Sequence, residues 1–159
     1  MKLVVQRLDI AAPPATVYAL LVDPAGFVTW MAETAELDPR PGGRIRWTHA
    51  NGDACSGEYV ELVPHRRVVF TYGWERAEVA IPPGSTTVEI DLEPVGGGTR
   101  LTLVHRGLEP LAADAHAGGW IHYLGRLATA ASGPPPGLDP FADRRVPTPE
   151  ELARAHDRP

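Results

Sequence analysis

Short segments that alternate apolar and polar side chains fill most of this chain, and turn residues separate them. They cover residues 2–10, 43–49, 54–63, 67–75, 85–93 and 99–106. Successive side chains of a strand point to opposite faces, so each segment predicts a strand with one apolar face. The pair Asn51-Gly52 between two of them is a strong hairpin signal, and consecutive hairpins produce an antiparallel sheet. Such a sheet must cover its apolar face with another element.

Only one predicted helix is long enough to provide that cover. In residues 112–131, Trp120, Tyr123, Leu124 and Leu127 recur at the i, i+3, i+4, i+7 spacing of an amphipathic helix. Two shorter helices are predicted at 14–22 and 24–30. We therefore expect an α+β fold, in which a curved antiparallel sheet of about seven strands wraps around a long C-terminal helix. A cavity is expected between them, because a curved sheet and a helix do not mesh everywhere.

The composition changes once along the chain. Residues 133–159 hold seven of the 17 prolines and few large apolar side chains. Proline removes a backbone donor, and too little apolar surface remains to offset the entropy of ordering the segment. We expect one domain over 1–132 and a poorly ordered tail over 133–159. Within the tail, Thr148 followed by Pro149 and Glu151 has the pattern of a helix start.

Charge and cysteine content exclude several classes of protein. The net charge of -5 argues against a nucleic-acid partner. No apolar run approaches the roughly 20 residues of a membrane span, and the first residues do not have the pattern of a signal peptide. The single cysteine, Cys55, permits no intrachain disulfide and no cysteine zinc cluster. A cytoplasmic protein without a cofactor is the expectation.

Several segments together resemble a known superfamily. The first run contains Ile10, Pro13, Val17, Tyr18, Leu20, Leu21, Asp23, Pro24, Phe27 and Trp30. The later ones are Gly42–Ile45, Gly57–Glu61, Arg67–Tyr72, Gly98–His105 and Gly118–Trp120. In this order they resemble the SRPBCC (START-like, helix-grip) superfamily, in the branch similar to the C-terminal domain of the heat-shock protein 90 ATPase activator.

The resemblance covers about residues 2–131 and implies the helix-grip fold. The superfamily includes lipid carriers, plant hormone receptors, pathogenesis-related proteins, polyketide aromatase/cyclases and dehydratase-like enzymes. Since a fold does not fix a function, three functions stay open. The favoured hypothesis is the binding of a small apolar or amphipathic molecule. The alternatives are an enzyme of the cyclase or hydratase type and a protein-interaction module that acts as a chaperone cofactor. A homodimer also stays open.

Large aromatic side chains on the predicted interior faces are the candidate ligand contacts, because small-molecule pockets are mostly apolar with few polar anchors. The predicted ligand-binding residues are Trp30, Trp47, Tyr59, Phe70, Tyr72, His105, Trp120, Tyr123 and Leu124. Ordinary core packing is the competing interpretation. The ligand is expected near the start of the long helix, where residues 112–119 are small, with His105 or Tyr123 as its polar anchor.

Few residues have the pattern of a catalytic or metal site. His105 ends an apolar strand face and could anchor a polar group of a ligand or act as a general acid or base. A histidine at a strand end that is hydrogen-bonded to the backbone is the competing interpretation. Glu61 shares the face of Tyr59 by alternation, and would be a buried carboxylate if that face is interior. A solvated strand face is the competing interpretation. His116 and His122 are six residues apart, so they do not share a helix face and do not predict a metal site.

Overall fold

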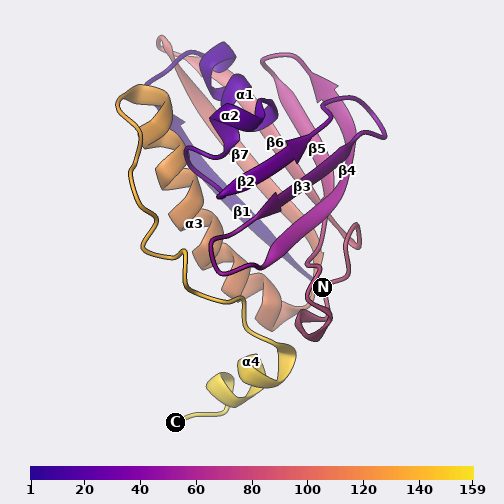
Figure 1. Ribbon diagram of the computed structural model, residues 1–159. Helices are drawn as coiled ribbons and strands as arrows, with labels where there is room; N and C mark the ends of the chain where they lie inside the picture. The colour runs from indigo at the N-terminus through magenta and orange to yellow at the C-terminus, as the bar shows by residue number, and fades with distance from the viewer.

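Seven antiparallel strands form one curved sheet in the computed structural model, which describes residues 1–159 (Figure 1). The strands are β1 (Lys2–Ile10), β2 (Thr34–Leu37), β3 (Arg44–Thr48), β4 (Ala54–Val63), β5 (Arg67–Tyr72), β6 (Thr86–Val95) and β7 (Gly98–Leu108). Their spatial order is β1-β7-β6-β5-β4-β3-β2, so β1 and β2 form the two edges. Hairpins connect β2 through β7 in sequence, whereas β1 pairs with the last strand.

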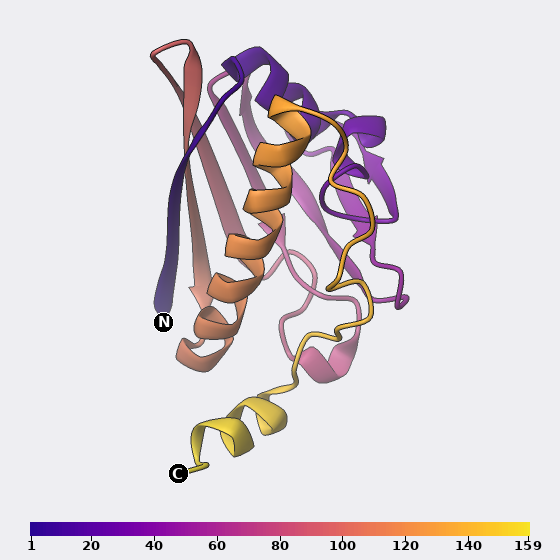
Figure 2. The same ribbon diagram turned by 90° about the vertical axis from the view of Figure 1, so that its left-hand side faces the viewer.

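One long helix lies across the concave face of this sheet (Figure 2). The helices are α1 (Pro14–Val22), α2 (Pro24–Phe27), the 3₁₀ turn η1 (Ala77–Val79), α3 (Pro110–Ser132) and α4 (Pro149–His156). α3 is the element that the sheet grips, and α1 and α2 close the end of the groove near the last turns of α3 (Figure 1). The predicted α+β helix-grip fold is therefore confirmed.

Three elements depart clearly from prediction, and the other boundaries agree with it within two residues. α2 ends at Phe27, three residues before the predicted end, and β5 ends at Tyr72 instead of continuing to residue 75. The sequence did not indicate β2, because four residues are too few to establish an alternation. β2 forms by pairing with β3, with Ala35 opposite Trp47.

The core lies between α3 and the sheet. Trp120, Leu124 and Leu127 are at most 5% exposed, as the helical spacing predicts, and they pack in one core with side chains of every strand except β2. None of the helices combines the length and the hydropathy that a membrane span requires.

A β-bulge in β4 reverses the side-chain pattern of that strand. Tyr59 pairs with Phe70 but Glu61 pairs with Val69, so one extra residue, Val60, lies between the two pairs. As a result Tyr59 is buried while Glu61 is exposed and bonds Arg67 on the outer face (3.1 Å). The prediction that Glu61 shares the face of Tyr59 is wrong, because simple alternation does not anticipate the extra residue.

The tail turns back after α3 and runs along it toward α4 (Figure 2). Asp139 accepts a hydrogen bond from the Tyr123 hydroxyl (2.9 Å) and pairs with His122 (2.7 Å), and the Phe141 ring stacks on His122 at 3.7 Å between centroids. α4 begins with the predicted capping box, in which Thr148 and Glu151 bond each other's backbone N–H groups. The tail thus has polar and stacking contacts that its composition did not indicate.

Removing residues 133–159 should leave the stability of the domain nearly unchanged, as the composition predicts. None of these residues is buried, and most of their contacts are partly exposed polar ones, each worth about 1 kcal/mol or less. The exception is the ion pair of Arg145 with the buried Asp53, which keeps Arg76 as a second partner when the tail is removed. Urea unfolding of a chain that ends at Ser132, compared with the full chain, measures the effect. A loss of several kcal/mol would mean that the tail is an integral part of the fold.

Candidate functional site

A cavity of about 270 Å³ lies between α3, the concave face of β3–β5 and the returning tail. Six aromatic side chains form much of its wall: Trp47, Tyr72, Trp74, Trp120, Tyr123 and Phe141. They come from β3, from β5 and the residues that follow it, from α3, and from the tail. The cavity therefore exists only when segments from all parts of the chain have assembled.

Two small residues of α3 leave the space for this cavity. Ala115 and Gly119 lie one helical turn apart on its wall, and a Cβ atom added at Gly119 would meet no atom within 4 Å. Larger side chains at these positions would extend into the empty volume. This agrees with the expectation that the small residues 112–119 leave room beside the first half of the helix.

A second hollow, of about 610 Å³, lies beyond the first one, between the start of α3, η1 and α4. It is larger, but no tryptophan, tyrosine or phenylalanine lines it. Ala115, His116, Val146 and Pro147 line both spaces. We regard the smaller one as the candidate site, because it combines aromatic walls with convergent polar groups.

Two tryptophan–histidine pairs contribute three residues to the cavity wall, Trp74, His116 and Trp120, and one residue behind it, His105. Trp120 Nε1 donates a hydrogen bond to His105 Nδ1 (3.1 Å), and Trp74 Nε1 donates one to His116 Nε2 (3.1 Å). In each histidine the nitrogen that faces the indole must therefore be an unprotonated acceptor. Both imidazoles are fixed as neutral tautomers by this arrangement.

The second nitrogen of each histidine is also used. His105 Nε2 lies 2.8 Å from Thr86 Oγ1, whose own proton goes to the Tyr72 carbonyl oxygen (2.8 Å). His116 Nδ1 donates to the Ala112 carbonyl oxygen (2.8 Å). Burial lowers the pKa of both histidines, that of His105 to about 3, where the nearby His116 adds to the effect.

These bonds define what His105 can do. It is fully buried and does not line the cavity, because the ring of Tyr72 packs edge-on against it at 4.7 Å between centroids. With both nitrogens occupied and the ring held neutral, His105 orients Trp120 and has no free position for a ligand or a transferred proton.

Other polar groups do reach the cavity wall. The Tyr72 hydroxyl lies beside the Cys55 thiol, and burial raises the pKa of both well above the usual values, so both stay protonated at neutral pH. The His49 ring stacks on Trp74 at 5.8 Å between centroids, and burial lowers the pKa of His49. The interior wall therefore presents uncharged donors among aromatic rings.

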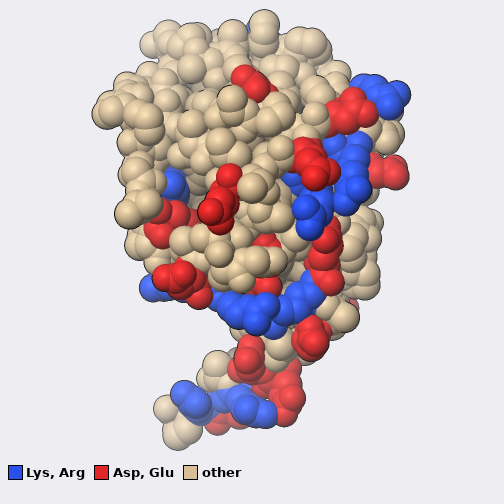
Figure 3. Space-filling view, in the orientation of Figure 1, with Lys and Arg blue, Asp and Glu red and all other residues tan.

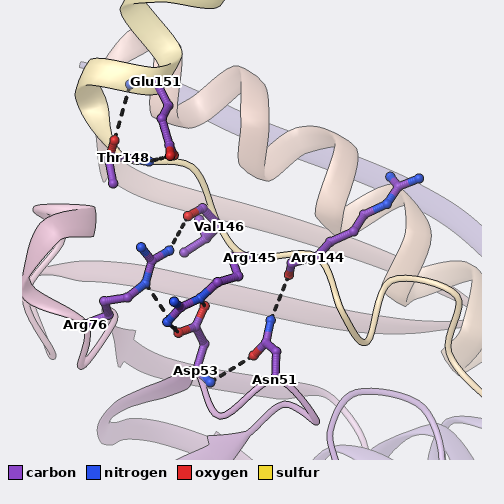
Figure 4. Close-up of polar contacts among 8 residues, drawn as sticks. All are labelled: Asn51, Asp53, Arg76, Arg144, Arg145, Val146, Thr148 and Glu151. Carbon is purple, nitrogen blue, oxygen red and sulfur yellow. Dashed lines mark hydrogen bonds and ion pairs between the residues drawn. The ribbon is translucent and has the colours of Figure 1, made fainter.

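Polar contacts between the tail and the loops that hold Asn51, Asp53 and Arg76 form the mouth of the cavity (Figure 4). Asp53 is only 3% exposed and pairs with Arg145 of the tail (2.7 Å) and with Arg76 (3.3 Å). The side-chain amide of Asn51 donates to the Arg144 carbonyl oxygen (3.0 Å), and the Arg76 guanidinium donates to the carbonyl oxygen of Val146. These bonds hold tail residues 144–146 against the turn after β3.

The structure brings only four of the predicted ligand-binding residues to the cavity. They are Trp47, Tyr72, Trp120 and Tyr123. The other five, Trp30, Tyr59, Phe70, His105 and Leu124, do not line it and belong to the buried interior. The sequence pattern assigns side chains to the concave face but does not indicate where along that face α3 packs closely.

The reasons differ among these five. Trp30 packs edge-on against Phe27, and its Nε1 donates to the Leu20 carbonyl oxygen (2.9 Å). Tyr59 and Phe70 pair with each other across β4 and β5 and pack in the main core. Leu124 follows Trp120 by one turn and packs in the main core.

Asp53 and the tail side chains of the cavity wall were not among the residues predicted from the sequence. Asp53 follows Asn51-Gly52, where a carboxylate usually faces solvent, and its burial depends on Arg145, 92 residues later in the chain. The polar, proline-rich tail has no periodic pattern that would indicate its position. The two arginines at 144 and 145 were the only local signal of a charge partner.

Comparisons with known proteins identify relatives of this arrangement. The model of the family described as "Activator of Hsp90 ATPase homolog 1-like protein" matches residues 11–132. A comparison with curated proteins finds no match.

Several solved structures are similar. An AHSA1-like protein from Rhizobium etli is 42% identical with a TM-score of 0.66, and the similarity covers 92% of this chain and 91% of that one. A protein from Chromobacterium violaceum is 28% identical with a TM-score of 0.69, over 83% of this chain and 98% of that one. The Aha1 dimer from Colwellia psychrerythraea is 22% identical with a TM-score of 0.71, over 83% and 97%.

Proposed function

The chain belongs to the Activator of Hsp90 ATPase homolog 1-like family, and within that family we propose that it binds a small apolar or amphipathic molecule. The ligand lies in the cavity between α3 and β3–β5. The observation that carries this proposal is the space beside Ala115 and Gly119, which six aromatic side chains surround. Concave, mostly apolar sites with few polar groups are typical of small-molecule binding.

The polar groups of the wall support the same proposal. The Tyr72 hydroxyl and the Cys55 thiol are proton donors that do not ionise at neutral pH, since burial raises the pKa of each. The two groups bond each other, so one of their two protons is used between them, and a ligand carbonyl or hydroxyl oxygen can accept the other without bringing a charge into the interior. Such groups fix the orientation of a ligand, and the rings supply most of its contact area.

The enzyme alternative loses the two residues on which it was based. Glu61 lies on the outer face of β4, and both ring nitrogens of His105 are occupied by Trp120 and Thr86. General acid–base catalysis requires a group within hydrogen-bond reach of the reacting atom. The binding proposal needs neither residue.

Filling the cavity should abolish binding without harming the fold. We expect Gly119→Leu to weaken the binding of the uncharged dye N-phenylnaphthylamine about tenfold or more, because the new side chain occupies the ligand's space. The matched control is Gly118→Leu, on the exposed side of the same helix turn, where an added Cβ also meets no atom within 4 Å. Both changes replace a helical glycine, so their intrinsic effects on helix stability are similar.

Fluorescence titration measures the dissociation constants. Saturable binding that Gly119→Leu weakens and Gly118→Leu leaves unchanged is the expected result. Equal binding by all three proteins would place the dye elsewhere, and no binding by the unaltered chain would favour a protein-interaction role. Because the similar protein from Colwellia psychrerythraea is a dimer, sedimentation of the same samples should report whether this chain also forms one.

A further inference from the structure

The cavity wall carries more positive than negative charges. Among the side chains that line it, only Asp53, Arg144 and Arg145 carry a full charge at neutral pH. Asp53 is 3% exposed, and its carboxylate is bonded by Arg145 through two nitrogens (2.7 and 3.3 Å) and approached by Arg76 (3.3 Å). The one carboxylate of the wall is therefore already neutralised by the protein.

The remaining titratable groups of the wall are uncharged. Burial lowers the pKa of His49 and His116 and raises the pKa of Cys55, Tyr72 and Tyr123. Arg145 pairs with Asp53, which raises the pKa of its guanidinium, and the nearby carboxylates of Glu78 and Glu151 add to this effect. The only charge on the wall without a carboxylate partner is the guanidinium of Arg144.

Arg144 is held in place although nothing neutralises it. Its guanidinium carbon lies 3.9 Å from the centre of the Phe141 ring, which in turn stacks on His122 at 3.7 Å. Asn51 bonds its backbone carbonyl oxygen (Figure 4). A guanidinium stacked on a ring keeps its N–H donors in the plane and available to a partner. The basic side chains also gather in a band across the lower part of the face in Figure 3, above α4.

From this charge distribution we propose that the ligand carries an oxyanion group, such as a carboxylate or sulfonate, which pairs with Arg144 while its apolar body fills the aromatic cavity. This proposal rests on the proposed binding function and adds the chemical class of the ligand. Planar guanidinium groups match oxyanions in geometry. Arg144 is exposed, so its ion pair with the ligand is sensitive to salt. The tail segment 141–147 is then the part of the site that determines specificity.

Two dyes with the same ring system distinguish charge from shape. Anilinonaphthalene sulfonate carries a sulfonate, and N-phenylnaphthylamine is the same molecule without it. We expect Arg144→Gln to weaken binding of the sulfonate about threefold and Arg144→Glu about tenfold, with the dissociation constant of the uncharged dye changed less than about twofold. Added salt should weaken sulfonate binding to the unaltered chain but not to Arg144→Gln.

The matched control is Arg154→Glu, which makes the same change of charge in α4, where Arg154 is exposed and lines neither hollow. It should bind both dyes like the unaltered chain. Equal loss of both dyes in Arg144→Glu, no loss of the sulfonate, or the same loss in Arg154→Glu would each overturn the inference. If the unaltered chain bound neither dye, the proposed function would fail and this inference with it. Binding of the uncharged dye alone would overturn only the inference.

Discussion

Replacing Trp120 with alanine should lower the free energy of unfolding by about 3–5 kcal/mol, because the change removes a large ring from the interface of α3 with the sheet. Trp120 is 5% exposed and belongs to the main core. The change also leaves His105 Nδ1, to which Trp120 Nε1 donates, without a partner in a fully buried position.

The neighbouring residue supplies the control. Ile121 is 61% exposed on the same helix, so Ile121→Ala should change the stability by about 0.5 kcal/mol or less. Urea unfolding of the three proteins gives the comparison. A loss below about 1 kcal/mol for Trp120→Ala would contradict the packing of α3 described above. Trp120→Phe keeps a ring but removes the donor, so its loss of stability should lie between those of Ile121→Ala and Trp120→Ala.

Acid should destabilise the protein through His105. Its pKa is about 3 in the folded state, mainly because of burial and secondarily because of His116, against about 6.5 when unfolded. At a pH between these two pKa values the His105 imidazole is protonated in the unfolded chain and neutral in the folded protein. The contribution of His105 to the free energy of unfolding is therefore fully present above about pH 6.5 and is lost as the pH falls toward 3. At about pH 5 the loss relative to neutral pH is about 2 kcal/mol.

Urea unfolding at about pH 7.5 and pH 5 tests this for the unaltered chain, His105→Gln and His156→Gln. The carboxylates and the buried histidines His49 and His116 contribute a background that all three proteins share. His105→Gln should be less stable at neutral pH, but its loss on acidification should be about 2 kcal/mol smaller. His156 is exposed in α4, so His156→Gln should behave like the unaltered chain. The same acid loss in all three proteins would show that His105 is not held neutral.

Most of the fold followed from local patterns, and the exceptions have physical causes. The alternation of Ile45 and Trp47 and the helical spacing of Trp120 and Leu124 identify faces that are buried in the structure. β2 was missed because its four residues form a strand only through their pairing with β3. Periodicity identifies a helix or strand that is long enough for its side-chain pattern to repeat. Shorter elements form only through pairing with their neighbours, which the local sequence does not indicate.

The candidate site was less predictable than the fold. Tyr59 and Tyr72 both lie on the buried face, yet only Tyr72 reaches the cavity, and the alternation of side chains along a strand does not distinguish the two positions. The bulge that turns Glu61 outward depends on pairing with β5 and has no signature in the sequence. The pair of Asp53 with Arg145 joins segments that no local pattern connects.

The pairing of the first strand with β7 has a consequence for how the chain is made. Val4 lies opposite His105, about a hundred residues later in the sequence. At the usual synthesis rate of about 5–20 residues per second, β1 leaves the ribosome roughly 5–20 seconds before its partner strand. The hairpins β2 to β6 can form during that interval, but the first strand must wait, with Leu3 and Val5 among its exposed side chains even in the finished protein. The pairing of β1 with β7, followed by the docking of α3, is therefore the step at which nascent chains are most open to misassociation. Slowing this step would lower the yield of folded protein without changing its final stability.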